Sequence, residues 1–240
     1  MYGPYTSVVQ QQLNLPAEFW YFKGDPVYRG ILEHTDRDQA LEYLELSRKK
    51  VDAKTFSELV QLFEKNDLYG KTIKEYLGED IGYASPSNAR YLHHSLLIKE
   101  HFDKFQTKNI VEIGGGYGGL CLYLKSMSDC NYYIFDLPAV MLLQDKYLKA
   151  HGLHCNFLSF ECNLPEDFFL VSNYCYSEIR DKSIREKYKT VIEKSVGGFM
   201  LWNAEATGND VTLSETFKDR KIEVCPETPL TGRNNVEIYY

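Results

Sequence analysis

The sequence predicts an α/β fold, in which a helical N-terminal region precedes a Rossmann-like sheet. An apolar run at 110–113 meets five glycines in six positions, and a helix-like segment then begins near Leu120. This is the strand, turn and helix start of a βαβ unit. A second apolar run ends at Asp136. Two late β-prone segments, 221–225 and 235–240, have no helix between them and are expected to close the sheet as an antiparallel hairpin.

The first 85 residues are expected to form an arm and a helical cap. Residues 1 to about 30 show no sustained period and predict an irregular arm that packs by its aromatic side chains. Helical spacing follows from 32 to about 64, and a short helix is predicted at 72–77. Ser85 before Pro86 marks the start of a longer helix. At about 100° per residue, His94 falls at the border of its buried face and His93 points away.

An α/β domain is expected over residues 86–240. Pro138 opens a helix that ends at His151 and Gly152. Further strands are predicted at 155–158, 167–172 and 197–202, and a charged helix at 183–194.

Composition limits the partners. The net charge of −7 argues against a nucleic-acid partner, since such proteins normally present a basic face. No apolar run approaches the length of a membrane span, and residues 1–12 lack the pattern of a secretory signal. We therefore expect a cytoplasmic protein. Its six cysteines, which are scattered and form no C-x-x-C pair, are expected to be reduced.

The glycine-rich loop fits two cofactor patterns. Gly114, Gly116 and Gly119 satisfy the dinucleotide pattern G-x-G-x-x-G. Glu112 also begins the frame E-x-G-x-G-x-G, which resembles motif I of class I S-adenosylmethionine-dependent methyltransferases. An acidic residue before the turn suits an amino-bearing cofactor better than a pyrophosphate. Asp136, at the end of the second strand, is well placed to accept the hydroxyls of a ribose.

Several further pieces occur together in order. They are 111–119, Phe135-Asp-Leu-Pro138 with 142–148, Ser172-Asn-Tyr-Cys-Tyr-Ser-Glu-Ile179, and a tail of Glu227-Thr-Pro-Leu-Thr231 with 235–240. Together they resemble the sugar O-methyltransferase family of glycan-modifying gene clusters, over roughly residues 85–240. The resemblance implies a class I methyltransferase fold, S-adenosylmethionine as donor, and a sugar hydroxyl as acceptor, for example on a deoxyhexose such as rhamnose. Residues 1 to about 80 match less well.

The cofactor residues follow from the loop and the strand ends. We assign Asp136 to the ribose hydroxyls and Leu137 to the adenine face, and Glu161 and Cys162 to the adenine amino group. Ser172 is expected near the methionine end. The methionine and ribose side is assigned to Glu112, Gly114, Gly115, Gly116 and Gly118.

Methyl transfer to a hydroxyl needs a residue that accepts a proton. Glu178 is the first candidate because it follows the fourth strand, where a substrate would lie, although it could instead cap the next helix or pair with Arg180 or Arg185. His94 is the second candidate, against the alternative of a packing residue. Asn173, Tyr176 and Arg90 are candidate substrate ligands. We predict no metal site, because the sequence contains no motif of carboxylates or histidines at the spacing of metal ligands.

Two other readings remain open. An NAD-dependent oxidoreductase would use the same glycines, and Glu112 counts against it. A non-catalytic methyltransferase-like module would bind a partner such as a glycosyltransferase. The sequence also leaves open whether the chain forms a homodimer.

Overall fold

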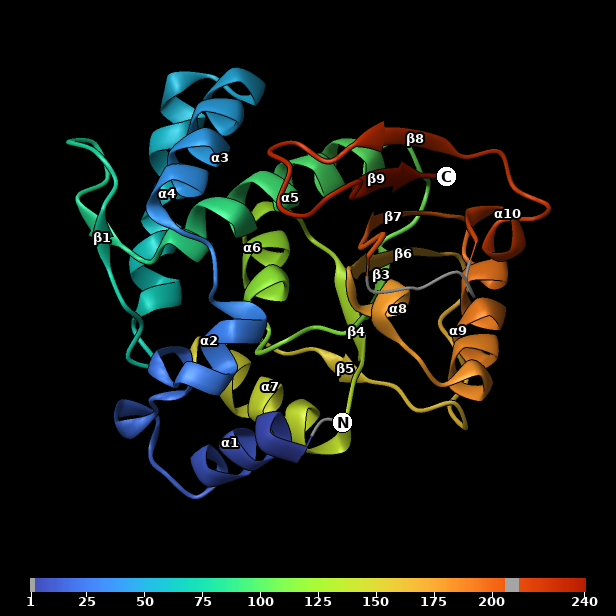
Figure 1. The fold of residues 1–240 in the computed structure, drawn as a ribbon, viewed down its shortest axis with the longest axis horizontal. Coiled ribbons are helices and arrows are strands. Elements are labelled where there is room, and N and C mark those ends of the chain that lie inside the picture. The colour runs from blue at the N-terminus through green and yellow to red at the C-terminus, as the bar shows by residue number, and fades with distance from the viewer. Residues whose placement is uncertain (1–2, 206–211) are drawn as a thin grey trace. The chain divides into compact units, whose positions relative to one another are not determined.

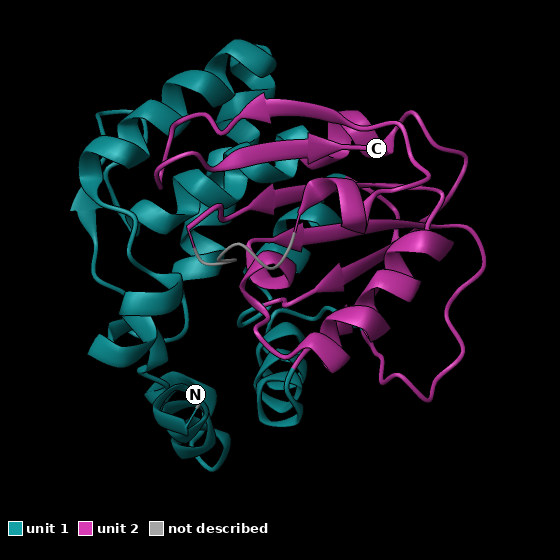
Figure 2. Ribbon diagram, turned by 45° about the vertical axis from the view of Figure 1, so that its right-hand side comes forward, with its two compact units in different colours: residues 1–97, 116–127, 137–155 teal, residues 98–115, 128–136, 156–240 magenta. Residues whose placement is uncertain are grey.

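The computed structural model describes residues 3–205 and 212–240. The chain forms two compact units, each assembled from separate stretches of sequence (Figure 2). Unit 1 comprises residues 1–97, 116–127 and 137–155, and unit 2 comprises 98–115, 128–136 and 156–240. The compact units thus differ from the contiguous division expected at residue 86, because residues 86–97, 116–127 and 137–155 group with the N-terminal helices.

Unit 2 contains a seven-stranded sheet in the order β5-β4-β3-β6-β7-β9-β8 (Figure 1). The first five strands in this order are parallel, and β9 runs antiparallel to both β7 and β8. This confirms the predicted fold class, an α/β fold with a seven-stranded sheet and an antiparallel closing strand. The strands are β3 (Asn109–Ile113), β4 (Asn131–Phe135), β5 (Asn156–Phe157), β6 (Phe168–Asn173), β7 (Gly197–Trp202), β8 (Glu223–Pro226) and β9 (Val236–Tyr239).

Three helices of unit 2 contribute to the apolar cluster on one face of this sheet. They are α8 (Cys175–Glu178), α9 (Lys182–Lys194) and α10 (Leu213–Thr216). Val111 and Ile113 of β3 point into this cluster, where Val191 and Ile192 of α9 meet them. Asp181 caps α9 by accepting hydrogen bonds from the Ser183 and Ile184 amides. Because side chains alternate along a strand, Glu112 points to the opposite face.

Unit 1 contains most of the helices. Its described elements are α1 (Gly3–Leu13), η1 (Ala17–Phe19), η2 (Phe22–Gly24), α2 (Pro26–Leu32), α3 (Arg37–Lys50), α4 (Ala53–Asp67), β1 (Glu75–Tyr76), β2 (Tyr83–Ala84), α6 (Gly119–Met127), α7 (Pro138–Ala150) and the first part of α5 (Pro86–Phe102).

Two predictions for the N-terminal region are wrong. The segment expected as an irregular arm contains α1 and α2. Its local period is weak, and α1 is fixed by tertiary contacts such as the hydrogen bond from Lys146 Nζ to the Leu13 carbonyl at 2.5 Å. The helix expected at 72–77 is absent from the described structure, because Glu75 and Tyr76 instead pair with β2 as an antiparallel ribbon.

Helix α5 begins at Pro86, as predicted, but is not amphipathic in the expected way. Every residue from Ser85 to Ile98 is buried. Within unit 1, His93 and His94 both pack against Tyr43, with ring centroids 5.6 and 5.4 Å from the tyrosine ring. A helix enclosed on all sides carries no reliable face signal in its sequence.

A buried polar cluster links the elements of unit 1. Asn66 donates to Tyr117 Oη at 3.0 Å, and Tyr147 Oη donates to Asn66 Oδ1 at 2.7 Å. The fully buried Lys23 ammonium donates to the Asn66 carbonyl and lies 4.3 Å from the Tyr117 ring centroid. Burial lowers the pKa of Lys23 to about 8, although the neighbouring Glu33 and Asp67 carboxylates oppose this shift.

We predict that this lysine makes stability depend on pH. The folded pKa is about 8 and lies below the unfolded value, so the unfolded chain binds more protons above pH 8 and stability rises with pH. Relative to Lys23→Met, the wild type should gain on the order of 1–2 kcal/mol between about pH 7 and about pH 9.5. Thermal unfolding at both pH values measures this difference.

Lys54→Met is the matched control, because Lys54 lies on the surface of α4. The pH trend of Lys54→Met should follow that of the wild type. Equal trends for Lys23→Met and the wild type would contradict a buried, titrating Lys23.

Candidate functional site

Polar and glycine residues gather where the parallel strands of unit 2 end. β3, β4, β6 and β7 run in the same direction, so their carboxyl ends lie at one edge of the sheet. Gly114 follows β3, Asp136 follows β4, Asn173 ends β6 and Asn203 follows β7. Ligands of open α/β sheets bind in the crevice at this edge.

The turn after β3 is held by close packing at Gly114. Its φ is +80°, and its amide donates to the Phe135 carbonyl at 2.8 Å, which ties the turn to the end of β4. A Cβ at this position would lie 2.3 Å from the Cys175 Sγ. The glycine pattern predicted a close approach by a ligand, but the nearest group at Gly114 is this thiol.

The thiol of Cys175 lies among carboxylates. Burial raises its pKa, and the negative charges of Asp136, Glu178 and Glu112 raise it further. Cys175 is therefore a protonated packing residue at neutral pH. These interactions place three of the sequence-predicted site residues around one side chain, although sequence reasoning had not singled out Cys175 itself.

Glu112 is held inside unit 2. It is 2% exposed and accepts a hydrogen bond from Tyr132 Oη of β4 at 3.0 Å. The carboxylate thus contributes a buried negative charge beneath the glycine turn, and Tyr132 fixes its orientation.

Ser172 and Asn173 are the last two residues of β6, and their side chains differ in their hydrogen bonds. Ser172 Oγ donates to the Ile113 carbonyl at 3.2 Å and accepts from the Tyr176 amide at 3.0 Å, so it connects β6 to β3 and to α8. Asn173 is half-buried, and its Oδ1 has no hydrogen-bond partner within the described residues. Because an unpaired buried oxygen is costly, it marks a place where a ligand donor or a water belongs.

Glu178 is exposed, and Asn203, the residue that follows β7, orients its carboxylate. Its Oε1 accepts a hydrogen bond from Asn203 Nδ2 at 2.9 Å. Asp181, rather than Glu178, caps α9, and Arg185 donates to the Ile179 carbonyl. Glu178 therefore has the geometry of a proton acceptor with an orienting partner.

Tyr176 does not fit the predicted role of a substrate ligand. It is 3% exposed and packs in the hydrophobic cluster, with its ring 5.9 Å from that of Trp202. Burial raises the pKa of its phenol. We assign it to the core.

The remaining cofactor candidates are spread over both units. In unit 1, Gln144 donates to the Gly116 carbonyl at 2.9 Å, Gly118 packs against Leu148, and Leu137 precedes the first turn of α7. In unit 2, Gly115 is buried, and Glu161 and Cys162 are exposed after β5. The roles of these residues remain predictions.

His94 and Arg90 belong to unit 1 and are both buried. Burial holds the pKa of His94 well below its usual range, and the neighbouring His93 and Arg90 add to this. His94 is thus neutral at pH 7. The Arg90 guanidinium donates to the Leu32 carbonyl and lies 5.6 Å from the Tyr91 ring centroid.

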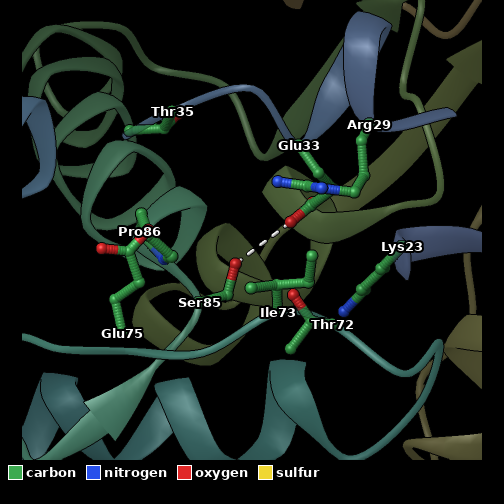
Figure 3. Close-up of a pocket in the computed structure, with 9 residues that line it drawn as sticks. All are labelled: Lys23, Arg29, Glu33, Thr35, Thr72, Ile73, Glu75, Ser85 and Pro86. Carbon is green, nitrogen blue, oxygen red and sulfur yellow. Dashed lines mark hydrogen bonds between the residues drawn. The ribbon is translucent and has the colours of Figure 1, made fainter. Parts of the chain in front are cut away.

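Unit 1 also contains a small pocket that sequence reasoning missed (Figure 3). Ser85 Oγ donates to Glu33 Oε2 across it at 3.1 Å, while Lys23 and Arg29 contribute cations. Its cavity volume is about 20 Å³, which is the size of a water site. Lining residues from 23 to 86 have no common sequence motif that could have indicated it.

Two negative findings concern the described residues. No group of three or more His, Cys, Asp or Glu side chains in this part of the chain is arranged to hold a metal ion. Within residues 3–205 and 212–240, no helix is long and apolar enough to cross a membrane.

Comparison with known proteins gives similarity of structure only. No protein-family model matches the sequence, and no curated protein matches it. An S-adenosylmethionine-dependent methyltransferase from Aquifex aeolicus is 15% identical, with a TM-score of 0.41 over 59% of this chain and 87% of that one.

Precorrin 8w decarboxylase from Methanobacterium thermoautotrophicum is 18% identical, with a TM-score of 0.44 over 61% of this chain and 87% of the other. A ribosomal protein L11 methylase from Lactobacillus delbrueckii is 8% identical, with a TM-score of 0.44 over 63% and 77%. The function of this chain must therefore be inferred from its own residues.

The packing at Gly114 can be tested by substitution. Gly114→Ala should destabilise the fold by about 3 kcal/mol, because it adds a clash with Cys175 to the cost of a left-handed φ. Gly152→Ala is the matched control, since its φ is +71° and its added Cβ meets nothing within 4 Å. It should cost only about 1 kcal/mol. Chemical denaturation measures both, and equal losses would show that the contact with Cys175 is unimportant.

Proposed function

We propose that this protein is an S-adenosylmethionine-dependent methyltransferase. The single observation that carries the proposal is the pairing of a left-handed glycine turn after β3 with a carboxylate, Asp136, directly after β4. The Gly114 amide donates a hydrogen bond to the carbonyl of Phe135, the last residue of β4, so the glycine turn lies next to Asp136. This is the arrangement in which a nucleoside is held at the edge of an α/β sheet.

The residues present fit this cofactor. Asp136 is half-buried, and its carboxylate suits the two ribose hydroxyls. The buried carboxylate of Glu112 and the unpartnered Oδ1 of Asn173 favour an amino-bearing ligand. We further propose that Gly115, Gly116 and Gly118 contribute backbone contacts. Leu137, Glu161 and Cys162 are proposed on the adenine side.

When bound, S-adenosylmethionine supplies an electrophilic methyl carbon on a sulfonium. The residues of this chain must then align an acceptor hydroxyl with that carbon and remove the hydroxyl proton as the C–O bond forms and the C–S bond breaks. Glu178 is our candidate for the base, because Asn203 orients its carboxylate at the carboxyl edge of the sheet. His94 is the second candidate; burial keeps its imidazole neutral but also makes it a weaker base, because its pKa lies well below the usual range.

A sugar hydroxyl is the acceptor that we propose, on a glycan or an activated sugar. The family resemblance of 172–179 and of the tail supports this choice, together with amide side chains at the carboxyl edge, Asn173 and Asn203, that suit neutral hydroxyls.

The alternatives are an NAD-dependent oxidoreductase and a non-catalytic module. The buried Glu112 carboxylate disfavours a pyrophosphate, and the antiparallel hairpin β8–β9 departs from a dehydrogenase sheet. For a module without activity, the glycine turn and Asp136 would have no role.

Calorimetry separates these readings. The wild type should bind S-adenosylhomocysteine at micromolar concentration and NAD weakly or not at all. Asp136→Ala should weaken S-adenosylhomocysteine binding about 10- to 100-fold, since it removes hydrogen bonds to a charged group. Asp103→Ala, a surface change at a residue paired with Lys99, is the control. Binding of NAD alone would reject the proposal, and binding of neither ligand would favour the module.

Mass spectrometry of methylated sugars tests the chemistry. Glu178→Gln should slow methyl transfer about 10²- to 10⁴-fold while leaving cofactor affinity intact, because only the proton acceptor is lost. Full activity in Glu178→Gln combined with a large loss in His94→Gln would move the role of base to His94.

A further inference from the structure

Tyr174 holds a backbone conformation that aromatic residues rarely adopt. Its φ is +65°, in the left-handed region, at the first position after β6. Such a conformation costs free energy and persists only where the surrounding contacts fix it. Here the Tyr174 amide donates to the Leu201 carbonyl at 2.8 Å, and its own carbonyl accepts from Ser177 Oγ at 2.6 Å.

The side chain of Tyr174 reaches a buried carboxylate. Its hydroxyl donates to the carboxylate of Glu227, which is 3% exposed. Glu227 also accepts from the Thr231 amide at 3.0 Å and from Thr231 Oγ1 at 2.8 Å. We call the Tyr174–Glu227 hydrogen bond the clasp. It ties the turn after β6 to the connection between β8 and β9.

This connection, residues 227–235, has a second attachment. Asn235 Oδ1 accepts from the Ala204 amide after β7 at 3.2 Å. The clasp and this bond join the segment to the turns that follow two neighbouring strands. The Thr228 amide also donates to Glu237 Oε1 at 3.2 Å, and the Glu227 amide donates to the Asn235 carbonyl at 3.1 Å.

The sheet register places the segment at the carboxyl edge. β9 is antiparallel to β7, and Trp202 at the end of β7 pairs with Val236 at the start of β9. Asn173 pairs with Leu201 on the other side of β7. The 227–235 segment therefore returns at the edge that carries the unpartnered Asn173 Oδ1 and the Asn203–Glu178 pair.

We propose that the clasp fixes residues 227–235 as the acceptor-side wall of the methyl-transfer site, and that this segment selects a hydroxyl-bearing acceptor. The inference rests on the proposed function. Arg233 and Asn234 are exposed and offer polar groups on the segment, and Leu230 is 57% exposed and offers an apolar surface. The Glu227 carboxylate already accepts hydrogen bonds from Tyr174 and Thr231, so it does not face an acceptor. A sugar ring, with hydroxyls and an apolar face, matches this combination.

Tyr174 and Glu227 are thus positioning residues, and hydrogen exchange tests their role. Tyr174→Phe and Glu227→Gln should each raise amide exchange across 227–235 by about 10-fold or more, since a hydrogen bond to a buried carboxylate is lost. Tyr21→Phe is the control, because it removes a side-chain hydrogen bond of unit 1, from Tyr21 Oη to Gln11 Oε1 at 2.8 Å. It should leave exchange in 227–235 unchanged. Unchanged exchange in Tyr174→Phe would overturn the clasp.

Kinetics test the acceptor role. The probes are the methyl glycosides of glucose, galactose, mannose and rhamnose, with S-adenosylmethionine as donor. Tyr174→Phe should raise KM for the methylated glycoside about 10-fold, with a smaller change in kcat. The double variant with Glu227→Gln should be no worse than Glu227→Gln alone, because the Tyr174 hydroxyl acts through the Glu227 carboxylate. An unchanged KM would overturn the acceptor role.

Affinity for S-adenosylhomocysteine separates this inference from the proposed function. It should stay within about two-fold of the wild type in Tyr174→Phe, since the clasp does not touch Gly114 or Asp136. A wild type that does not bind S-adenosylhomocysteine rejects the proposed function itself. A wild type that binds it and methylates none of the four glycosides overturns the sugar acceptor and, with it, this assignment of the segment.

Discussion

The close approach of Gly114 to Cys175 is the constraint on which the site in unit 2 depends. It brings the turn after β3 against the turn after β6, and the Gly114 amide bonds at the same point to the last residue of β4. Three strand ends are thereby joined within a few ångströms. Any side chain at 114 would separate them, and the positions of Asp136 and Asn173 would change together.

Hydrogen bonds then hold individual side chains at this edge. Tyr132 orients Glu112, Asn203 orients Glu178, and Ser172 binds both the Ile113 carbonyl and the Tyr176 amide. Several residues that look like ligands in the sequence are thus supports for other residues. The Ser172 hydroxyl is hydrogen-bonded to residues of β3 and α8, and the Tyr176 side chain lies in the hydrophobic core.

The core of unit 1 is held together by buried polar side chains. Its core contains a buried lysine, asparagines and tyrosines rather than a purely apolar cluster, so its stability depends on matched hydrogen bonds. No local sequence pattern indicates this polar core, since Lys23 and Asn66 lie far apart in the chain. The same long-range contacts explain why α1 forms where local periodicity predicts an irregular arm.

Local signals in the sequence determined the sheet and the candidate cofactor edge. Apolar runs, prolines at helix starts and the glycine turn act over a few residues, so the strands, the start of α5 and the place of Asp136 could all be predicted. Tertiary structure alone decided which polar groups face which partners. The contact of Cys175 with Gly114, the left-handed Tyr174 reaching Glu227, and the burial of Tyr176 depend on residues distant in sequence. Such contacts are set by packing, which no local pattern encodes.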